Sequence, residues 1–126
     1  MARNFPDPIS ITVPLRTTWE ERWELMDEHG DPLDLTDYQF RMQVRDKVSR
    51  ALLLEIGTEA DYAVIDLPTG AIDITVPAEV VEALSPDNAK VKAVFDAEIY
   101  IPGASEYVIP VLKGSVSLLP RVTEAP

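Results

Sequence analysis

The segment YQFRMQVRD, residues 38–46, alternates strictly between apolar and polar residues and is the clearest pattern in the chain. Because successive side chains of an extended chain point to opposite faces, it predicts a β-strand with one face on a core and the other toward water. The core-facing residues are Tyr38, Phe40, Met42 and Val44, and the water-facing residues are Gln39, Arg41, Gln43 and Arg45.

The same period of two residues recurs along the chain, between turns rich in Gly, Pro and Asp. Pro14 donates no backbone hydrogen bond, so we expect the first strand to lie at the edge of its sheet. The turns PTG, 68–70, and PGAS, 102–105, each predict a hairpin between the strands beside them. A glycine within a strand pattern often marks a bulge, so we expect one at Lys113 and Gly114. The further predicted strands cover residues 9–15, 51–57, 62–67, 71–76, 89–101 and 106–120.

The segment TTWEERWELMDEHGD, 17–31, fits both a helix and a strand. Its two tryptophans, Trp19 and Trp23, fit one face of a helix or alternate positions of a strand, in which Glu21 would lie on the wrong face. We favour the strand, because the turn DEHGDP would then return the chain as a hairpin into the 38–46 strand.

Two segments differ from this alternation. PLDLTD, 32–37, is expected to cross between sheets, with its leucines inward and with Asp34 or Thr36 bonded to nearby backbone amides. PAEVVEALSP, 77–86, predicts one short helix, because proline suits the first helical position and the apolar residues recur at helical spacing.

Eight or nine short strands without a strand–helix–strand rhythm predict an all-β fold, namely an antiparallel β-sandwich of immunoglobulin-like or jelly-roll-like kind with one short helix. At 126 residues the chain has the size of a single domain. We expect residues 1–8 to form a flexible N-terminal arm, 9–123 the sandwich domain and 124–126 a short tail. Little besides Pro14 and Pro110 blocks the edge segments of such a sandwich, so pairing with neighbouring chains is expected.

Composition excludes several classes of function. The chain has no cysteine and a single histidine, His29, so disulfides, thiolate metal sites and histidine relays are excluded. A net charge of −11 disfavours nucleic acid and anionic lipid as partners. No apolar run approaches the roughly 18 residues of a membrane span, and no signal-like segment begins the chain, so we expect a protein made in a cytoplasm with no membrane contact.

Candidate catalytic and metal chemistry finds little support. The acidic residues of the 27–37 turn suggest a calcium site, but their spacing matches no EF-hand, and Asp is also the common residue of turns. No serine lies in a nucleophile-elbow motif, and no glycine pattern is typical of a phosphate-binding loop. The sequence therefore predicts a protein that is not an enzyme and has no metal or cofactor.

The candidate partner-binding residues are those that the strand patterns turn away from the core. Arg41, Gln43 and Arg45 share the outer face of the 38–46 strand, where an acidic second subunit could dock, and Tyr100 points away from the core side of its own strand. The alternative is a solvated sheet face, since opposite charges across strands also stabilise a single sheet. A sugar-binding platform is a further alternative, formed by the aromatic residues Trp19, Trp23, Tyr38, Tyr62, Tyr100 and Tyr107.

Three segments together resemble the small β-sandwich proteins of tailed-bacteriophage virions, which lie at baseplates, tail tips or the bases of receptor-binding fibres. GDPLDLTDYQFRMQVRD, 30–46, is similar to their turn before a strand, although Asp37 stands where glycine is commoner. LPTGAIDITVPAEVVEAL, 67–84, is similar to their hairpin and small helix. AVFDAEIYIPGASEYVIPVLKGSVSLLPRVT, 93–123, is similar to their closing pair of strands.

This resemblance implies a structural protein of a virion, located in the tail, the baseplate or a fibre attachment and made in the cytoplasm of the bacterial host. Its partners would be other virion proteins and copies of itself, as a trimer or hexamer. Two alternatives stay open, a carbohydrate-binding β-sandwich module and a capsid decoration or head-to-tail connecting protein.

Overall fold

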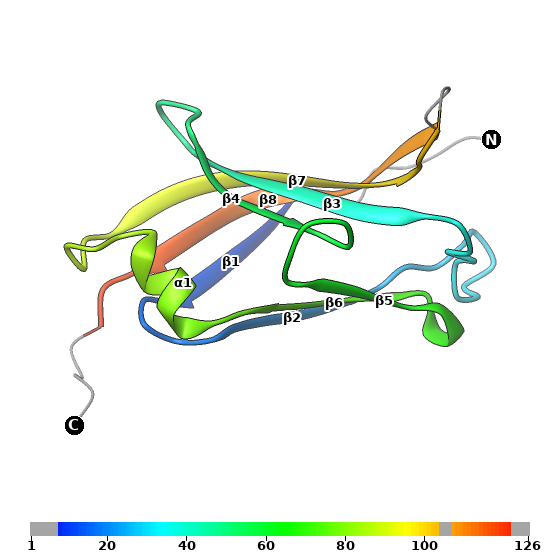
Figure 1. Ribbon diagram of the computed structural model, residues 1–126, viewed down its shortest axis with the longest axis horizontal. Coiled ribbons are helices and arrows are strands. Elements are labelled where there is room, and N and C mark those ends of the chain that lie inside the picture. Colours follow the sequence, from blue (N-terminus) through cyan, green and yellow to red (C-terminus); the bar gives the residue numbers. More distant parts are fainter. Residues whose placement is uncertain (1–7, 104–106, 122–126) are drawn as a thin grey trace.

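The computed structural model describes residues 8–103 and 107–121, which form two packed sheets (Figure 1). This architecture confirms the predicted all-β sandwich with one short helix. The elements are β1 (Ile9–Pro14), β2 (Trp19–Glu24), β3 (Gln39–Asp46), β4 (Leu52–Gly57), β5 (Ala63–Asp66), the 3-10 helix η1 (Leu67–Thr69), β6 (Ala71–Val76), α1 (Ala78–Ala83), β7 (Val91–Ile101) and β8 (Tyr107–Leu119).

The larger sheet has the strand order β1-β8-β7-β3-β4 and the smaller one β2-β6-β5. The hairpins β5–β6 and β7–β8 are antiparallel, as their turns predict. β1 lies at the edge expected from its proline, but it pairs with β8 in parallel, which departs from a purely antiparallel sandwich. The two strands stand at opposite ends of the chain, so no hairpin forces them to run in opposite directions.

Gly114 has a different role from the predicted bulge. The register of β7 and β8 shifts between Ala97 and Glu98, so the irregularity in β8 falls at Val111. Gly114 lies opposite Ile9, and a Cβ added to it would stand 1.9 Å from the carbonyl oxygen of Ile9. The glycine is therefore required by the close approach of β1.

The 17–31 segment, whose pattern fitted both a helix and a strand, contains the strand β2. The predicted hairpin from this segment into β3 is wrong. β2 pairs with β6 in the smaller sheet, whereas β3 lies in the larger one. The chain turns back only as far as the bridge between Met26 and Pro32, and then crosses to the other sheet with Leu35 buried. Burial of this leucine between the layers outweighs the local tendency of the turn to form a longer hairpin.

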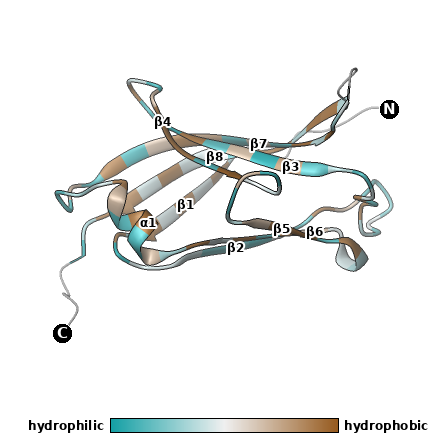
Figure 2. Ribbon diagram, viewed as in Figure 1, coloured by the Kyte–Doolittle hydropathy of each residue, from teal (hydrophilic) through white to brown (hydrophobic). Residues whose placement is uncertain are grey.

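The core lies between the two sheets, where the inward residues of every long strand meet. Figure 2 shows the corresponding bands of hydrophobic and hydrophilic residues along the strands of the larger sheet. Trp23 of β2 stacks on Phe95 of β7 with ring centroids 6.2 Å apart, which joins the two layers. α1 covers one end of the sandwich and buries Val81 in the same core (Figure 1).

Glu21, which the strand pattern placed on the wrong face, has a partner there. The indole nitrogen Nε1 of Trp19 donates a hydrogen bond to Oε1 of Glu21 at 3.1 Å. This bond offsets part of the cost of turning a carboxylate inward. Among the described residues, no helix is both long and apolar enough to span a bilayer.

Candidate functional site

All four candidate partner-binding residues lie on the outer face of the larger sheet. Arg41, Gln43 and Arg45 point outward from β3, because Phe40, Met42 and Val44 between them are buried. Tyr100 of β7 is opposite Gln39 in the register, and Arg41 is opposite Glu98. The alternation of β3 and the pairing with β7 therefore bring the four side chains onto one surface.

Arg41 and Tyr100 form one unit with two glutamates. The guanidinium carbon of Arg41 lies 4.1 Å from the ring centroid of Tyr100, a cation–π contact, and its Nε donates to Oε2 of Glu98 at 2.6 Å. The Tyr100 hydroxyl donates to Oε1 of Glu59 at 2.6 Å. Tyr100 thus faces away from the core as predicted, but only 7% of its surface is exposed. Its contribution is to hold Arg41 and the 58–62 loop in place.

Gln43 and Arg45 are also joined to each other. Arg45 donates from Nε and Nη2 to Oε1 of Gln43 at 3.2 and 2.8 Å, and from Nη1 to the carbonyl oxygen of Arg50 at 3.0 Å. The amide of Gln43 reaches Oε2 of Glu55 on β4 at 3.4 Å. These bonds order the side chains before any partner arrives, which lowers the entropy cost of binding.

A groove of about 600 Å³ lies on the same face, between β3, β4, β7 and the loop that follows β4. Arg41 lines it together with four carboxylates, those of Glu55, Glu59, Asp96 and Glu98. Arg41 and Arg45 lie on the outer face as predicted, but Arg41 is paired with Glu98 and the groove around it is acidic, so this part of the face is less suited to an acidic partner than the sequence suggested. Positive charge gathers instead at the β3–β4 turn, which carries Lys47 and Arg50 beside Arg45.

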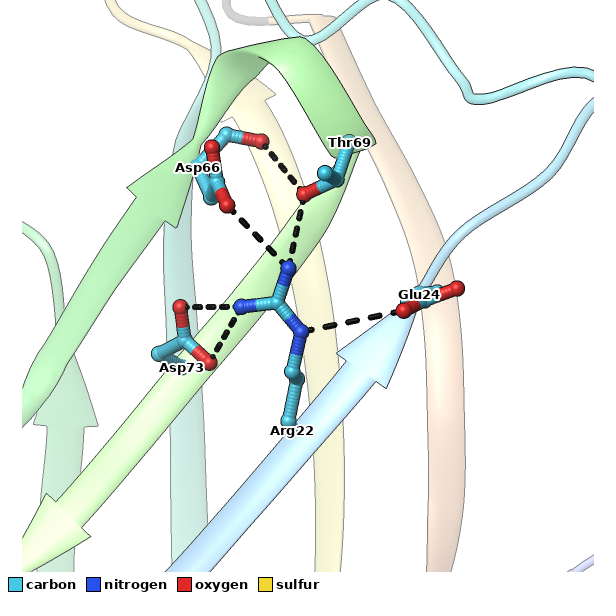
Figure 3. Close-up of polar contacts among 5 residues, drawn as sticks. All are labelled: Arg22, Glu24, Asp66, Thr69 and Asp73. Atoms are coloured by element: carbon cyan, nitrogen blue, oxygen red, sulfur yellow. Dashed lines mark hydrogen bonds and ion pairs between the residues drawn. The ribbon is translucent and has the colours of Figure 1, made fainter.

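Sequence reasoning missed a second polar cluster, on the outer face of the smaller sheet (Figure 3). Arg22 of β2 donates from Nη1 to both carboxylate oxygens of Asp73 at 2.8 and 2.6 Å. Its Nη2 donates to Asp66 at 3.1 Å and to the hydroxyl of Thr69 at 2.9 Å. Nε of Arg22 lies 3.7 Å from Oε1 of Glu24. One side chain thus ties β2, β6 and the end of β5 together.

Charge and hydrogen bonding shift the pKa values in this cluster. The side-chain hydrogen bonds to Asp73 and Asp66 raise the pKa of Arg22. The hydrogen bond from Arg22, followed by that from Thr69, lowers the pKa of Asp66. No signal in the sequence could have found the cluster, because Arg22 and Asp73 are 51 positions apart and meet only through the register of β2 with β6.

The acidic turn between β2 and β3 is used for backbone contacts. Oδ1 of Asp27 accepts from the amides of His29 and Asp31 at 2.8 and 3.0 Å. Oδ1 of Asp34 accepts from the amide and the hydroxyl of Thr36 at 3.0 and 2.7 Å, and these bonds lower the pKa of Asp34. Within residues 8–103 and 107–121, no three His, Cys, Asp or Glu side chains are grouped so that they could hold a metal ion.

The aromatic residues considered for a sugar platform are dispersed. Trp19 is buried, and Trp23 stacks on Phe95 between the layers. The ring of Tyr100 is covered by Arg41, while Tyr107 is exposed at the start of β8. Three of the six rings are thus engaged within the protein and do not offer a face for a pyranose to stack on.

Comparison with known proteins adds no relative to this picture. No protein-family model matches the sequence, and no curated protein is similar to it. The function is therefore inferred from the outer face of the larger sheet, from its strand edges and from the resemblance of the three segments.

Proposed function

We propose that the protein is a non-enzymatic structural component of a bacteriophage virion, in the tail, the baseplate or a fibre attachment. It would hold copies of itself and larger virion proteins through the edges and the outer face of its five-stranded sheet. The resemblance of segments 30–46, 67–84 and 93–123 to phage β-sandwich proteins supports the virion as the place of action.

The observation that carries the proposal is the pre-ordered polar face beside an open strand edge. Arg41 donates to Glu98, and Arg45 donates to Gln43, so all three outward side chains of β3 are held in place, and β4 ends the sheet directly beside them. An ordered polar face gives orientation and specificity, and an open edge offers backbone hydrogen bonds to an added strand. An ordered polar face and an open strand edge both suit a structural protein that joins larger proteins in a fixed geometry.

The rival reading as a carbohydrate-binding module depends on an exposed aromatic face. Of the rings nearest the groove, Tyr100 already carries Arg41 on one face and donates its hydroxyl to Glu59. The groove itself is acidic, and no ring other than those of Phe40 and Tyr100 lines it in the part of the chain that the structure describes. These contacts favour protein docking over sugar stacking.

The proposal is tested by looking for the chain in particles. Virions of the phage or prophage that encodes the chain are purified and analysed by mass spectrometry, and an antibody labels its position by electron microscopy. The expected result is a fixed copy number in the particle and label on the tail. Absence from purified virions, with the protein abundant in the lysate, would overturn the proposal.

A charge-reversal variant tests whether the outer face of the larger sheet makes the contact through which the protein is incorporated into the virion. Arg45→Glu reverses a charge on that face, whereas Arg22→Glu makes the same change on the smaller sheet. We expect the first variant to be incorporated less and the second to be incorporated normally if it folds. Circular dichroism confirms folding of each, and normal incorporation of Arg45→Glu would assign docking to another surface.

A further inference from the structure

The outer edge of β4 is an open strand edge. β4 is the last strand of the larger sheet and pairs on one side with β3. On its other side, Gly57 forms a bridge with Tyr62, and its amide donates to the carbonyl of Asp61 at 3.0 Å. Because backbone groups alternate between the two sides of a strand, those of Glu55, two residues earlier, point to the same open side.

A bulge leaves further backbone unpaired on this edge. Val44 is opposite Leu54 and Arg45 is opposite Leu52, so Leu53 has no register partner on β3. The edge from 52 to 55 therefore offers amide and carbonyl groups that a neighbouring strand could pair with.

Two exposed apolar side chains lie at the start of β4 and in the turn before it. Leu52 is 47% exposed and Val48, in the turn before it, is 90% exposed. Burial of such groups against a second molecule removes apolar surface from water and favours association.

The other edges are protected by features that β4 lacks. β1 ends in Pro14, the stretch of β8 beyond β1 contains Pro110, and β2 carries several charged residues. β5 spans only four residues. Proline, charge and shortness are the usual means of blocking edge pairing, whereas LLLEIG in β4 has no proline and one charge.

The charges along β4 decide which strand would fit. At its beginning, Arg45 lies opposite Leu52 and the preceding turn carries Lys47 and Arg50, with Asp46 as the one acid of residues 45–50. Toward its end, Glu55 lies in the strand and Glu59 and Asp61 follow it, while Arg41, opposite Gly57, is paired with Glu98. When a strand pairs antiparallel with a copy of itself, the beginning of one lies beside the end of the other. Basic residues of each copy would then face acidic residues of its partner, whereas parallel pairing would place like charges together.

We infer that two copies of this chain pair antiparallel through β4 and join their five-stranded sheets into one continuous sheet across a twofold axis. The inference rests on the proposed function and names the contact through which copies of the protein associate. A hexamer would then be a trimer of β4-linked dimers, because a twofold contact closes after two subunits.

Sedimentation velocity of the purified full chain, over a dilution series up to millimolar concentration, tests the inference. The wild type should form a dimer that dissociates on dilution, and Leu52→Lys should raise the dimer dissociation constant by about tenfold or more, because an edge lysine blocks strand pairing. Val64→Lys is the control, since Val64 is also an exposed apolar residue, 65% accessible against 47% for Leu52, and lies in an edge strand of the other sheet. A wild type that stays monomeric, or equal weakening by both variants, would overturn the inference.

A charge exchange covers the case in which Leu52→Lys fails to fold. Arg50→Glu alone should weaken the dimer, and the double variant Arg50→Glu, Asp61→Arg should restore it, because the opposed charges are exchanged and not lost. Hydrogen exchange gives an independent readout, in which the Glu55 amide becomes protected as the protein concentration rises. No restoration together with unchanged Glu55 exchange would assign the contact to another surface.

These outcomes are separable from those of the virion test. A β4-linked dimer in a protein that is absent from particles would overturn the proposed function and leave the inference standing. Incorporation of Leu52→Lys into particles at the wild-type copy number would overturn the inference and leave the function standing. An assembly larger than a dimer that is insensitive to Leu52→Lys would also contradict the β4 contact.

Discussion

Arg41 on the outer face of the larger sheet and Arg22 on the outer face of the smaller one are each held by carboxylates from neighbouring strands. Arg41 has the support of Glu98, stacks on Tyr100 and lines a groove. Arg22 is surrounded by three carboxylates and a hydroxyl, which come from β2, β6 and the end of β5 with its 3-10 helix. The same residue type therefore shapes a candidate binding surface in one sheet and ties three short strands together in the other.

The largest expected loss of stability comes from a substitution that removes a ring contact between the two sheets. Phe95→Ala removes the ring that stacks on Trp23 between the layers, at a site only 4% exposed. We expect a loss of about 3–5 kcal/mol in the free energy of unfolding, since a large cavity replaces the ring. Urea denaturation measures it, with Phe95→Leu as the control that keeps much of the volume. Equal stability of the alanine variant and the wild type would show that the stack does not join the layers.

A smaller loss of stability is expected from Gly114→Ala, and its structural effect should be confined to the five-stranded sheet. Gly114→Ala places a methyl group against the carbonyl oxygen of Ile9, so β1 must move away from β8. We expect a cost of about 1–3 kcal/mol in unfolding free energy, as for other overpacked sites. Hydrogen exchange should become faster in β1 and stay unchanged in β2, β5 and β6. Faster exchange in the smaller sheet as well would mean that the layers do not respond separately.

Removal of Arg41 should affect the surface more than the stability. Arg41→Ala leaves Glu98 without this hydrogen bond and uncovers the Tyr100 ring, and we expect a loss of about 1–2 kcal/mol. Tyrosine fluorescence or near-ultraviolet circular dichroism would report the change around Tyr100. Arg41→Lys keeps the charge but not the planar fork, so it should recover part of the loss. Full recovery by lysine would show that charge alone matters.

The smallest effect is a pH dependence on the smaller sheet. The hydrogen bond from Arg22 lowers the pKa of Asp66 in the folded protein below the ordinary value of 3.8. A carboxyl group with a lowered folded pKa stabilises the fold above its unfolded pKa, and this stabilisation is lost as the pH falls through the folded value. In Arg22→Gln, the free energy of unfolding should therefore fall less steeply than in the wild type as the pH drops below 3.8. Denaturation at several pH values measures this difference. Asp46 is the internal control, because its pKa is lowered by the Ser49 and Val48 amides and not by Arg22.

The candidate surface could be predicted in part. Alternation along 38–46 placed Arg41, Gln43 and Arg45 outward, and parity placed Tyr100 on the outer side of its strand. The burial of Tyr100 could not be predicted, since its hydroxyl donates to Glu59, which lies 41 positions away in the sequence. The acidic groove and the open edge of β4 were also hidden, because each depends on which strands become neighbours.

The sequence by itself determined most of the strands with their inward and outward faces, the short helix and the hairpins β5–β6 and β7–β8, because each follows from residue spacing and turn residues a few positions apart. The 17–31 segment fitted a helix and a strand alike, and the hairpin expected from it does not form. Only the tertiary structure decided that β2 pairs with β6, that β1 runs parallel to β8 and that Gly114 is there for the close approach of Ile9. Strand partners and register depend on burial and backbone pairing between distant segments, and a period of two residues is the same for every strand that could take each place.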